Sequence, residues 1–213
     1  LYAPGIGDDT RGLSMLLTII ETLKTEKIQP KDDILFVGSV GEEGLGDLRG
    51  VKHLFREEGP RIDSWIAIDG GSIGRVNNKA LGSYRYRVTF KGPGGHSWGA
   101  FGLANPHHAL GEAISNFVKV ADEYTSEGPK TSYNVGVISG GTSINSIPFE
   151  SVMQIDIRSL DPKRLDAMEA LLQTAVQKAL VQQNNTKRQG PDLSVEIDKI
   201  GNRRQSILWK RIT

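Results

Sequence analysis

The order of hydrophobic periodicities between residues 80 and 200 constrains the fold of this chain more than any other feature. Four segments alternate apolar and polar residues, as strands with one solvated face do, and two longer segments repeat apolar residues at helical spacing. We expect strands at residues 84–90, 133–137, 153–157 and 193–197, and helices that begin at Asn105-Pro106 and Asp161-Pro162. The resulting β-α-β-β-α-β order is that of a ferredoxin-like sandwich.

The first 78 residues follow the pattern of an α/β domain. Residues 10–24 carry apolar side chains at helical spacing, with Thr10 as the expected N-cap. Two short apolar runs, at residues 34–40 and 65–68, are typical of buried parallel strands. We therefore predict two domains, at residues 1–78 and 79–200, with residues 201–213 as a candidate return to the first.

Acidic residues stand at the ends of these expected elements. Glu42 and Glu43 follow the first apolar run, Asp69 follows the second, and Asp8 precedes the helix. Ligands of open parallel sheets gather at the carboxyl ends of the strands, and bare carboxylates at such points call for a cation. A divalent metal held by oxygen ligands is the interpretation we favour. Taken singly, the Glu42-Glu43 pair also fits a solvated turn, and Asp8 also fits an acid at a helix N-terminus.

Composition excludes several other classes of protein. The 213 residues carry a formal net charge of +1 with no basic block, which argues against a nucleic-acid partner. Cysteine is absent, so disulfides and thiolate metal sites are excluded. No apolar run approaches the roughly 18 residues that a membrane span needs, so we expect no membrane partner.

Four motifs occur in order: Asp8 in Gly-Ile-Gly-Asp-Asp, the Gly-Glu-Glu-Gly of residues 41–44, Asp69, and the Gly-Gly-His-Ser of residues 94–97. Together they resemble the dizinc aminoacylase/carboxypeptidase G/peptidase T family, metallopeptidases whose α/β catalytic domain carries an inserted lid, or dimerisation domain. The resemblance implies that Asp8 bridges two zinc ions and that Glu43 and Asp69 each ligate one of them. Glu42 is then the general base. Zinc rests on the resemblance, since carboxylates alone equally admit manganese or cobalt.

The resemblance also assigns three residues of the lid. His96 would reach the active site of a partner subunit and stabilise the oxyanion of the tetrahedral intermediate. Asn145 would contact the oxyanion or the scissile group, and Arg158 would clamp a carboxylate of the substrate. Taken singly, the same three residues fit a surface His, a turn residue and a surface strand Arg. We interpret His107 and His108, in the first turn of a helix, as structural or exposed.

Two parts of the family pattern are absent: a His-x-Asp motif before Asp8 and a last His ligand beyond residue 213. We therefore expect a fragment, truncated at both ends, that binds zinc poorly and has little or no activity by itself.

For the parent protein we predict hydrolysis of an amide bond in small peptides, as in a peptidase T-like di- or tripeptidase or aminopeptidase. The expected protein is cytoplasmic and a homodimer through the lid. One alternative is an N-acyl amino acid deacylase of the same family. Another is a non-catalytic dimerisation module left by truncation, although such a module would be expected to lose Asp8 or Glu42 first, because acids without metal repel one another.

Overall fold

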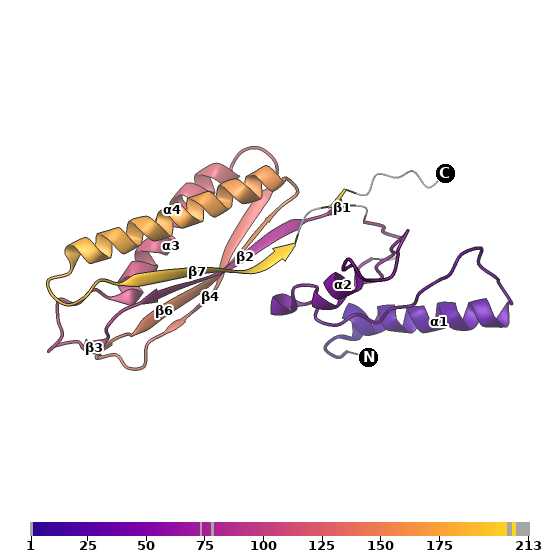
Figure 1. The fold of residues 1–213 in the computed structure, drawn as a ribbon, viewed down its shortest axis with the longest axis horizontal. Coiled ribbons are helices and arrows are strands. Elements are labelled where there is room, and N and C mark those ends of the chain that lie inside the picture. Colours follow the sequence, from indigo (N-terminus) through magenta and orange to yellow (C-terminus); the bar gives the residue numbers. More distant parts are fainter. Residues whose placement is uncertain (1, 73, 78, 204–205, 208–213) are drawn as a thin grey trace. The chain divides into compact units, whose positions relative to one another are not determined.

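The computed structural model describes residues 2–72, 74–77, 79–203 and 206–207. The chain divides into two compact units, Leu1–Asn77 and Asn78–Thr213. All the strands of the described residues belong to the second unit (Figure 1).

The second unit, which we call the lid, is a two-layer sandwich of an antiparallel sheet and two helices. Its long elements are β2 (Gly82–Lys91), α3 (Pro106–Thr125), β4 (Thr131–Gly140), β6 (Glu150–Ser159), α4 (Pro162–Thr186) and β7 (Ser194–Arg203). The sheet order is β4-β6-β2-β7, and every neighbouring pair is antiparallel. Both helices cover one face of the sheet (Figure 1). This arrangement confirms the ferredoxin-like prediction and, with it, the mixed α/β class.

Two short ladders lie at opposite ends of this sheet (Figure 1). At one end β3 (Gly95–His96) pairs with β5 (Ser146–Ile147), and at the other β1 (Lys79–Ala80) pairs with β8 (Ser206–Ile207). Residues 201–203, part of the candidate return to the first domain, belong instead to β7. Residues 204–205 and 208–213 of that segment lie outside the described residues.

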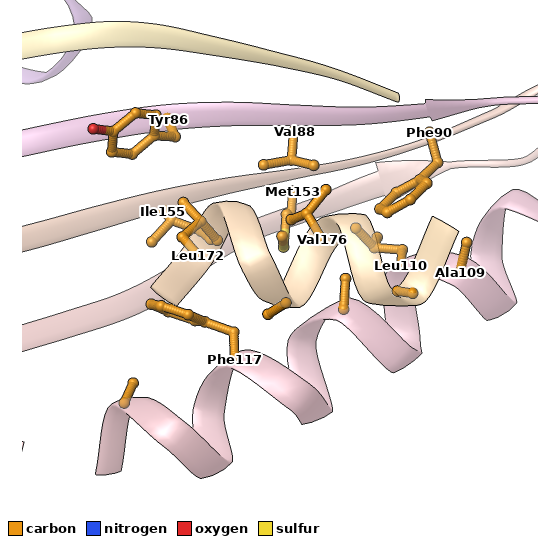
Figure 2. Packing of buried hydrophobic residues seen from close by; sticks show 14 of the residues in the cluster. Tyr86, Val88, Phe90, Ala109, Leu110, Phe117, Met153, Ile155, Leu172 and Val176 are labelled. Carbon is orange, nitrogen blue, oxygen red and sulfur yellow. The ribbon is translucent and has the colours of Figure 1, made fainter. Parts of the chain in front are cut away.

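The hydrophobic core of the lid lies between the sheet and the helices (Figure 2). Alternate residues of β2 face the helices, and the antiparallel register places Tyr86 beside Ile155 and Val88 beside Met153 of β6. From the other layer, Phe117 of α3 is fully buried and its ring contacts that of Tyr133 edge-on, 5.3 Å between centroids. The alternate, core-facing residues of the strands thus pack against the apolar face of the two helices.

Both long helices begin where the sequence predicts. The Asn105 side chain accepts a hydrogen bond from the His107 amide at 2.9 Å, and the Asp161 side chain accepts one from the Lys163 amide at 2.9 Å. Each cap is followed by proline at the first helical position, where the missing amide hydrogen is no loss.

One strand departs from the predicted alternation. The sequence places Val137 on the same face as Tyr133 and Val135, but the register of β4 shifts between Val135 and Val137. Val137 therefore pairs with Gln154. The neighbours of Gln154 on β6 face the core, so Gln154 points away from it, and Val137 is exposed on that side. The physical reason is a β-bulge at Gly136, which inserts one residue and reverses the faces of those that follow.

The first unit contains helices α1 (Arg11–Thr25) and α2 (Arg49–Leu54), a π-type turn at Ile6–Thr10 and a 3-10 turn at Gly44–Gly46. The helix predicted at 10–24 is confirmed, but its predicted cap is wrong. Thr10 has helical backbone angles and no capping bond, and the Asp9 carboxylate instead accepts from the Gly12 amide at 2.9 Å.

The two buried strands predicted for residues 34–40 and 65–68 do not form. Within the described part of the first unit neither run has a strand partner, and Ile34, Leu35, Val40 and Ile66 are exposed. A strand is stable only when neighbouring strands satisfy its backbone groups and a layer covers its side chains, and neither condition is met there.

The described residues contain no helix that is both long enough and apolar enough to cross a membrane.

Candidate functional site

Two of the predicted metal ligands, Asp8 and Asp69, lie together in the first unit. A Cβ built on Gly70 would be only 3.3 Å from the Cβ of Asp8, so the loop after Asp69 runs directly against Asp8. The charge of Asp69 is the largest cause that raises the pKa of Asp8, followed by burial, a hydrogen bond with Asp69 and the charges of Asp9 and Glu42. The Asp69 carboxylate therefore lies close to that of Asp8.

One hydrogen bond joins the two segments that carry this acidic pair. Asp8 has extended backbone angles inside the turn before α1, and the peptide bond between Asp8 and Asp9 is cis. Arg11, at the start of α1, donates from Nη2 to the carbonyl oxygen of Gly71 at 2.9 Å. This bond fastens the turn that carries Asp8 to the loop that carries Asp69, across 60 residues of sequence.

The two glutamates of the Gly-Glu-Glu-Gly loop differ in how they lie with respect to the Asp8–Asp69 pair. Gly41 has a φ of 65°, and a Cβ there would be 2.6 Å from the Arg49 guanidinium carbon. Glu42 is half-buried and its charge acts on Asp8. Glu43 is exposed and extended at the start of the 3-10 turn, and it is not among the groups that shift the pKa of Asp8. The structure thus brings Asp8, Asp69 and Glu42 toward one another, and it leaves the Glu43 side chain exposed.

The chemistry of the acidic pair fits a cation, although the ligand set is incomplete. Two carboxylates held close together repel each other, and a divalent cation bound between them removes that repulsion. The described residues nevertheless contain no group of three or more His, Asp or Glu side chains arranged to hold a metal ion. Metal binding by Asp8, Glu43 and Asp69 therefore stays a prediction.

In the lid, the structure brings His96 and Asn145 together from segments far apart in sequence. His96 pairs with Ser146 in the β3–β5 ladder, and the Ser97 amide donates to the Asn145 carbonyl oxygen at 2.9 Å. Both side chains are exposed. We call this end of the lid, residues 94–103 and 140–149, the lid tip.

A hydrogen bond selects the tautomer of His96. The Trp98 backbone amide donates to Nδ1 of His96 at 3.2 Å. A backbone amide can only donate, so Nδ1 is the acceptor and the neutral ring carries its proton on Nε2. His96 therefore presents an N–H donor on the side of the ring that faces away from its own loop.

Arg158 does not lie with these residues. It stands eight residues beyond Glu150 along β6, so at about 3.3 Å per residue it is roughly 26 Å from the end of the strand that adjoins the lid tip. Its Nε donates to Asp156 at 2.6 Å, and Arg85 donates to the other oxygen of the same carboxylate at 2.9 Å. Burial alone would raise the pKa of Asp156, but hydrogen bonds from the two guanidinium groups hold it below its usual value.

The interpretation of His107 as structural or exposed did not foresee that it supports the turn that carries Asn145. His107, at the start of α3, shares a 2.6 Å hydrogen bond between its Nδ1 and the hydroxyl of Ser151, which is fully buried. The imidazole lies against Gly140 and Gly141, where added Cβ atoms would be 3.1 and 2.8 Å from the ring. The Gly-Gly pair was the visible signal, since positive φ and close approach both require glycine.

The fold and the acidic pair define a class: an acid-bearing first unit followed by a ferredoxin-like α/β lid. Residues 78–184 match the family described as Peptidase dimerisation domain, and residues 1–93 match the family described as Peptidase family M28. The first match covers half of the chain. The chain therefore belongs to the family of peptidases with this dimerisation domain, which confirms the family predicted from its motifs.

Two proteins named succinyl-diaminopimelate desuccinylase align with most of this chain. Succinyl-diaminopimelate desuccinylase of Methylibium petroleiphilum is 27% identical over 166 residues, 74% of this chain and 43% of that protein. The protein of the same name from Albidiferax ferrireducens is 26% identical over 186 residues, 84% of this chain and 48% of that protein. The chain thus spans less than half the length of these relatives.

A solved structure shares the fold over nearly the whole chain. Aminopeptidase PepT from Bacillus cereus matches with a TM-score of 0.63 and 23% identity, over 95% of this chain and 50% of that one. The crystal structure of AtUAH in complex with glyoxylate matches with a TM-score of 0.53 and 19% identity, over 61% of this chain and 29% of that one.

Proposed function

We propose that the protein to which these residues belong is a metal-dependent hydrolase that cleaves an amide bond in small peptides, as a di- or tripeptidase or aminopeptidase. The observation that carries the proposal is the contact of Asp8 with Asp69, with Glu42 near enough to act on Asp8. Family membership supports it, because the chain combines this acidic pair with a peptidase dimerisation domain. The shared fold of an aminopeptidase is consistent with the same class.

The carboxylates divide into two roles. Asp8, Glu43 and Asp69 would hold metal ions, most simply zinc, with manganese or cobalt as alternatives. When bound, the ions supply Lewis acidity that favours water as a nucleophile at neutral pH. Glu42 takes the proton of the attacking water and delivers it to the leaving amine. Its half-buried place beside the acidic pair suits a base that must stay near the ligands without being one.

The lid tip supplies the electrophilic side of the reaction. Neutral His96 donates from Nε2 toward the oxyanion, and the hydrogen bond from the Trp98 amide to Nδ1 favours that tautomer. Asn145 offers its amide to the same group or to the scissile bond. We propose that these residues serve the acidic site of a second copy, so that hydrolysis requires the dimer.

Arg158 would clamp a carboxylate of the substrate through its planar guanidinium. The roughly 26 Å of β6 between it and the lid tip exceeds the length of a di- or tripeptide, taken as about 3.5 Å per residue. One chain's Arg158 and its own His96 would therefore act on different substrate molecules.

The homodimer is proposed to form through the edge strand β4. This strand lies at the end of the sheet order, its Ile138 is 62% exposed, and an unpaired edge readily adds a strand of another copy. Light scattering of Ile138→Asp should show a shift to monomer. Val181→Asp, which places the same charge on an exposed aliphatic position of α4, should leave the dimer intact. A dimeric Ile138→Asp variant would exclude this edge.

The reaction is tested with the full-length protein, loaded with zinc and assayed against di- and tripeptides and against N-acyl amino acids. Turnover of peptides that is lost in Glu42→Gln, with metal content unchanged, is the expected result. A Glu42→Gln variant as active as the wild type would refute the assignment of the base.

The relatives support a second candidate. Two proteins that match this chain over 74% and 84% of its length are named succinyl-diaminopimelate desuccinylase, which points to removal of an acyl group from an amino acid. The same residues would serve that reaction with a different substrate. Exclusive turnover of N-acyl amino acids in the assay above would favour the deacylase and reject the peptidase. If the protein hydrolyses neither class of substrate, the alternative of a non-catalytic dimerisation module would be favoured.

A further inference from the structure

The lid tip carries large apolar side chains that the rest of the chain does not cover. Trp98 is 88% exposed, Ile144 is fully exposed at 104%, and Phe149 is 69% exposed. These residues stand next to the two predicted contacts of the tip: Trp98 lies two residues after His96, and Ile144 directly precedes Asn145. Contiguous exposed apolar patches mark interaction or ligand-binding sites.

The loop that presents Trp98 is held in one conformation. Its turn is closed by hydrogen bonds from the Ala100 amide to the His96 carbonyl at 2.8 Å and from the Phe101 amide to the Trp98 carbonyl at 3.3 Å. The Gln189 side chain fixes the same loop by donating to the Phe101 carbonyl at 2.8 Å. An exposed tryptophan on an ordered loop loses little entropy when a ligand covers it.

The other side of the tip is equally fixed. The ring of Phe149 lies against Gly94, where a Cβ would be 2.6 Å from it, and the Gly92 amide donates to the Phe149 carbonyl at 2.8 Å. Ile144 is carried between Ser143 and Asn145, whose side chains are joined by a 2.5 Å hydrogen bond. The apolar side chains are therefore carried on the same two hydrogen-bonded loops as His96 and Asn145.

We propose that Trp98 and Ile144 bind an apolar substituent of the substrate next to the scissile amide, so that the protein prefers substrates with a branched or aromatic side chain or acyl group. This inference rests on the proposed function, because it places the scissile carbonyl at His96 and Asn145. The substituent next to a carbonyl that both residues contact would reach Trp98 and Ile144, because the β3–β5 pairing places their two loops side by side. Burial of that substituent and of the two side chains supplies the selectivity.

The kinetic test compares matched substrates in the full-length, metal-loaded protein: Leu-Gly-Gly with Gly-Gly-Gly, and N-acetyl-leucine with N-acetyl-glycine. Trp98→Ala should lower kcat/KM for the leucine substrates by about tenfold or more and for the glycine substrates less than twofold. Trp98→Phe should recover most of the loss. The control is Phe101→Ala, an exposed aromatic of the same loop whose ring lies under Arg188, and it should not change the preference.

Two kinetic results overturn the proposal. An equal loss for leucine and glycine substrates would show that Trp98 contacts a second copy of the protein instead of the substrate. No loss for either would show that it contacts neither.

A binding measurement separates this inference from the reaction. In Glu42→Gln full-length protein, N-acetyl-leucine should shift tryptophan emission to shorter wavelength, N-acetyl-glycine should not, and Trp98→Phe should abolish the shift. If that shift occurs while the wild type hydrolyses no amide, the proposed reaction fails and the apolar site stands. If amides are hydrolysed but the shift is absent, the apolar site fails and the reaction stands.

Discussion

Substitution of Gly141 tests how the turn before Asn145 is held in place. Gly141 has a φ of +77°, and a Cβ there would be 2.8 Å from Nε2 of His107. An L-residue in the left-handed region costs about 1–2 kcal/mol. The imidazole must also move, which breaks its bond to the buried hydroxyl of Ser151 at a cost of about 1–3 kcal/mol. Gly141→Ala should therefore destabilise the lid by about 2–5 kcal/mol, the sum of these two effects.

A double-mutant cycle with His107→Ala separates the two contributions. Without the imidazole no steric conflict remains, so Gly141→Ala should cost only about 1–2 kcal/mol in that background. The coupling energy is then about 1–3 kcal/mol. Gly99→Ala is the matched control, because no atom lies within 4 Å of its added Cβ, and it should change stability by less than about 1 kcal/mol.

The free energies are measured by denaturant-dependent hydrogen exchange of the β6 amides, since central strand amides exchange through global unfolding of their unit. This readout reports on the lid without interference from the first unit. If Gly141→Ala costs the same with and without His107, the imidazole does not support the turn.

Three further predictions concern the lid. Phe117→Ala removes a fully buried ring and should lower the free energy of unfolding by about 3–5 kcal/mol in urea titrations, whereas exposed Ser115→Ala should have little effect; equal effects would refute the packing described. Burial and a hydrogen bond to Asp122 raise the pKa of Tyr133 to about 12, so its contribution to stability is present below pH 10 and is lost as the pH rises toward 12. Phenolate absorbance should show this late titration, and a midpoint near 10 would contradict it. The pKa of Asp156 is below its ordinary 3.8, so its contribution is present above that pH and is lost as the pH falls through the lower folded value. Carboxyl chemical shifts should show the pKa rise in Arg158→Gln, and no change would contradict the ion pair.

Much of the lid could be predicted because its signals are local. Asn105 and Asp161 each precede a proline and a helical stripe, and the structure shows both as caps. The alternation of apolar and polar residues in β2 and β6 predicted which side chains face the helices. The bulge at Gly136 was not predicted, because a glycine within an alternating run does not state that an extra residue is inserted.

The first unit was harder to predict because its elements depend on partners. The apolar run at 34–40 has the composition of a buried strand, but without neighbouring strands in the described residues its backbone forms none. Contacts between distant residues also escaped the sequence: neither the bond of Arg11 to Gly71 nor that of His107 to Ser151 leaves a periodic signal. Asp8 and Asp69 were predicted to meet at a metal site, but the strand expected to position Asp69 does not form, and loops bring the two residues together instead.

The proposed metal centre is tested most directly by the metal content of the full-length protein after dialysis, measured together with hydrolysis. We expect about two zinc ions per wild-type chain. Glu42→Gln should keep both ions and lose hydrolysis, and Asp8→Ala should lose at least one ion. An Asp8→Ala variant that retains the full metal content would contradict the claim that this carboxylate holds the metal centre.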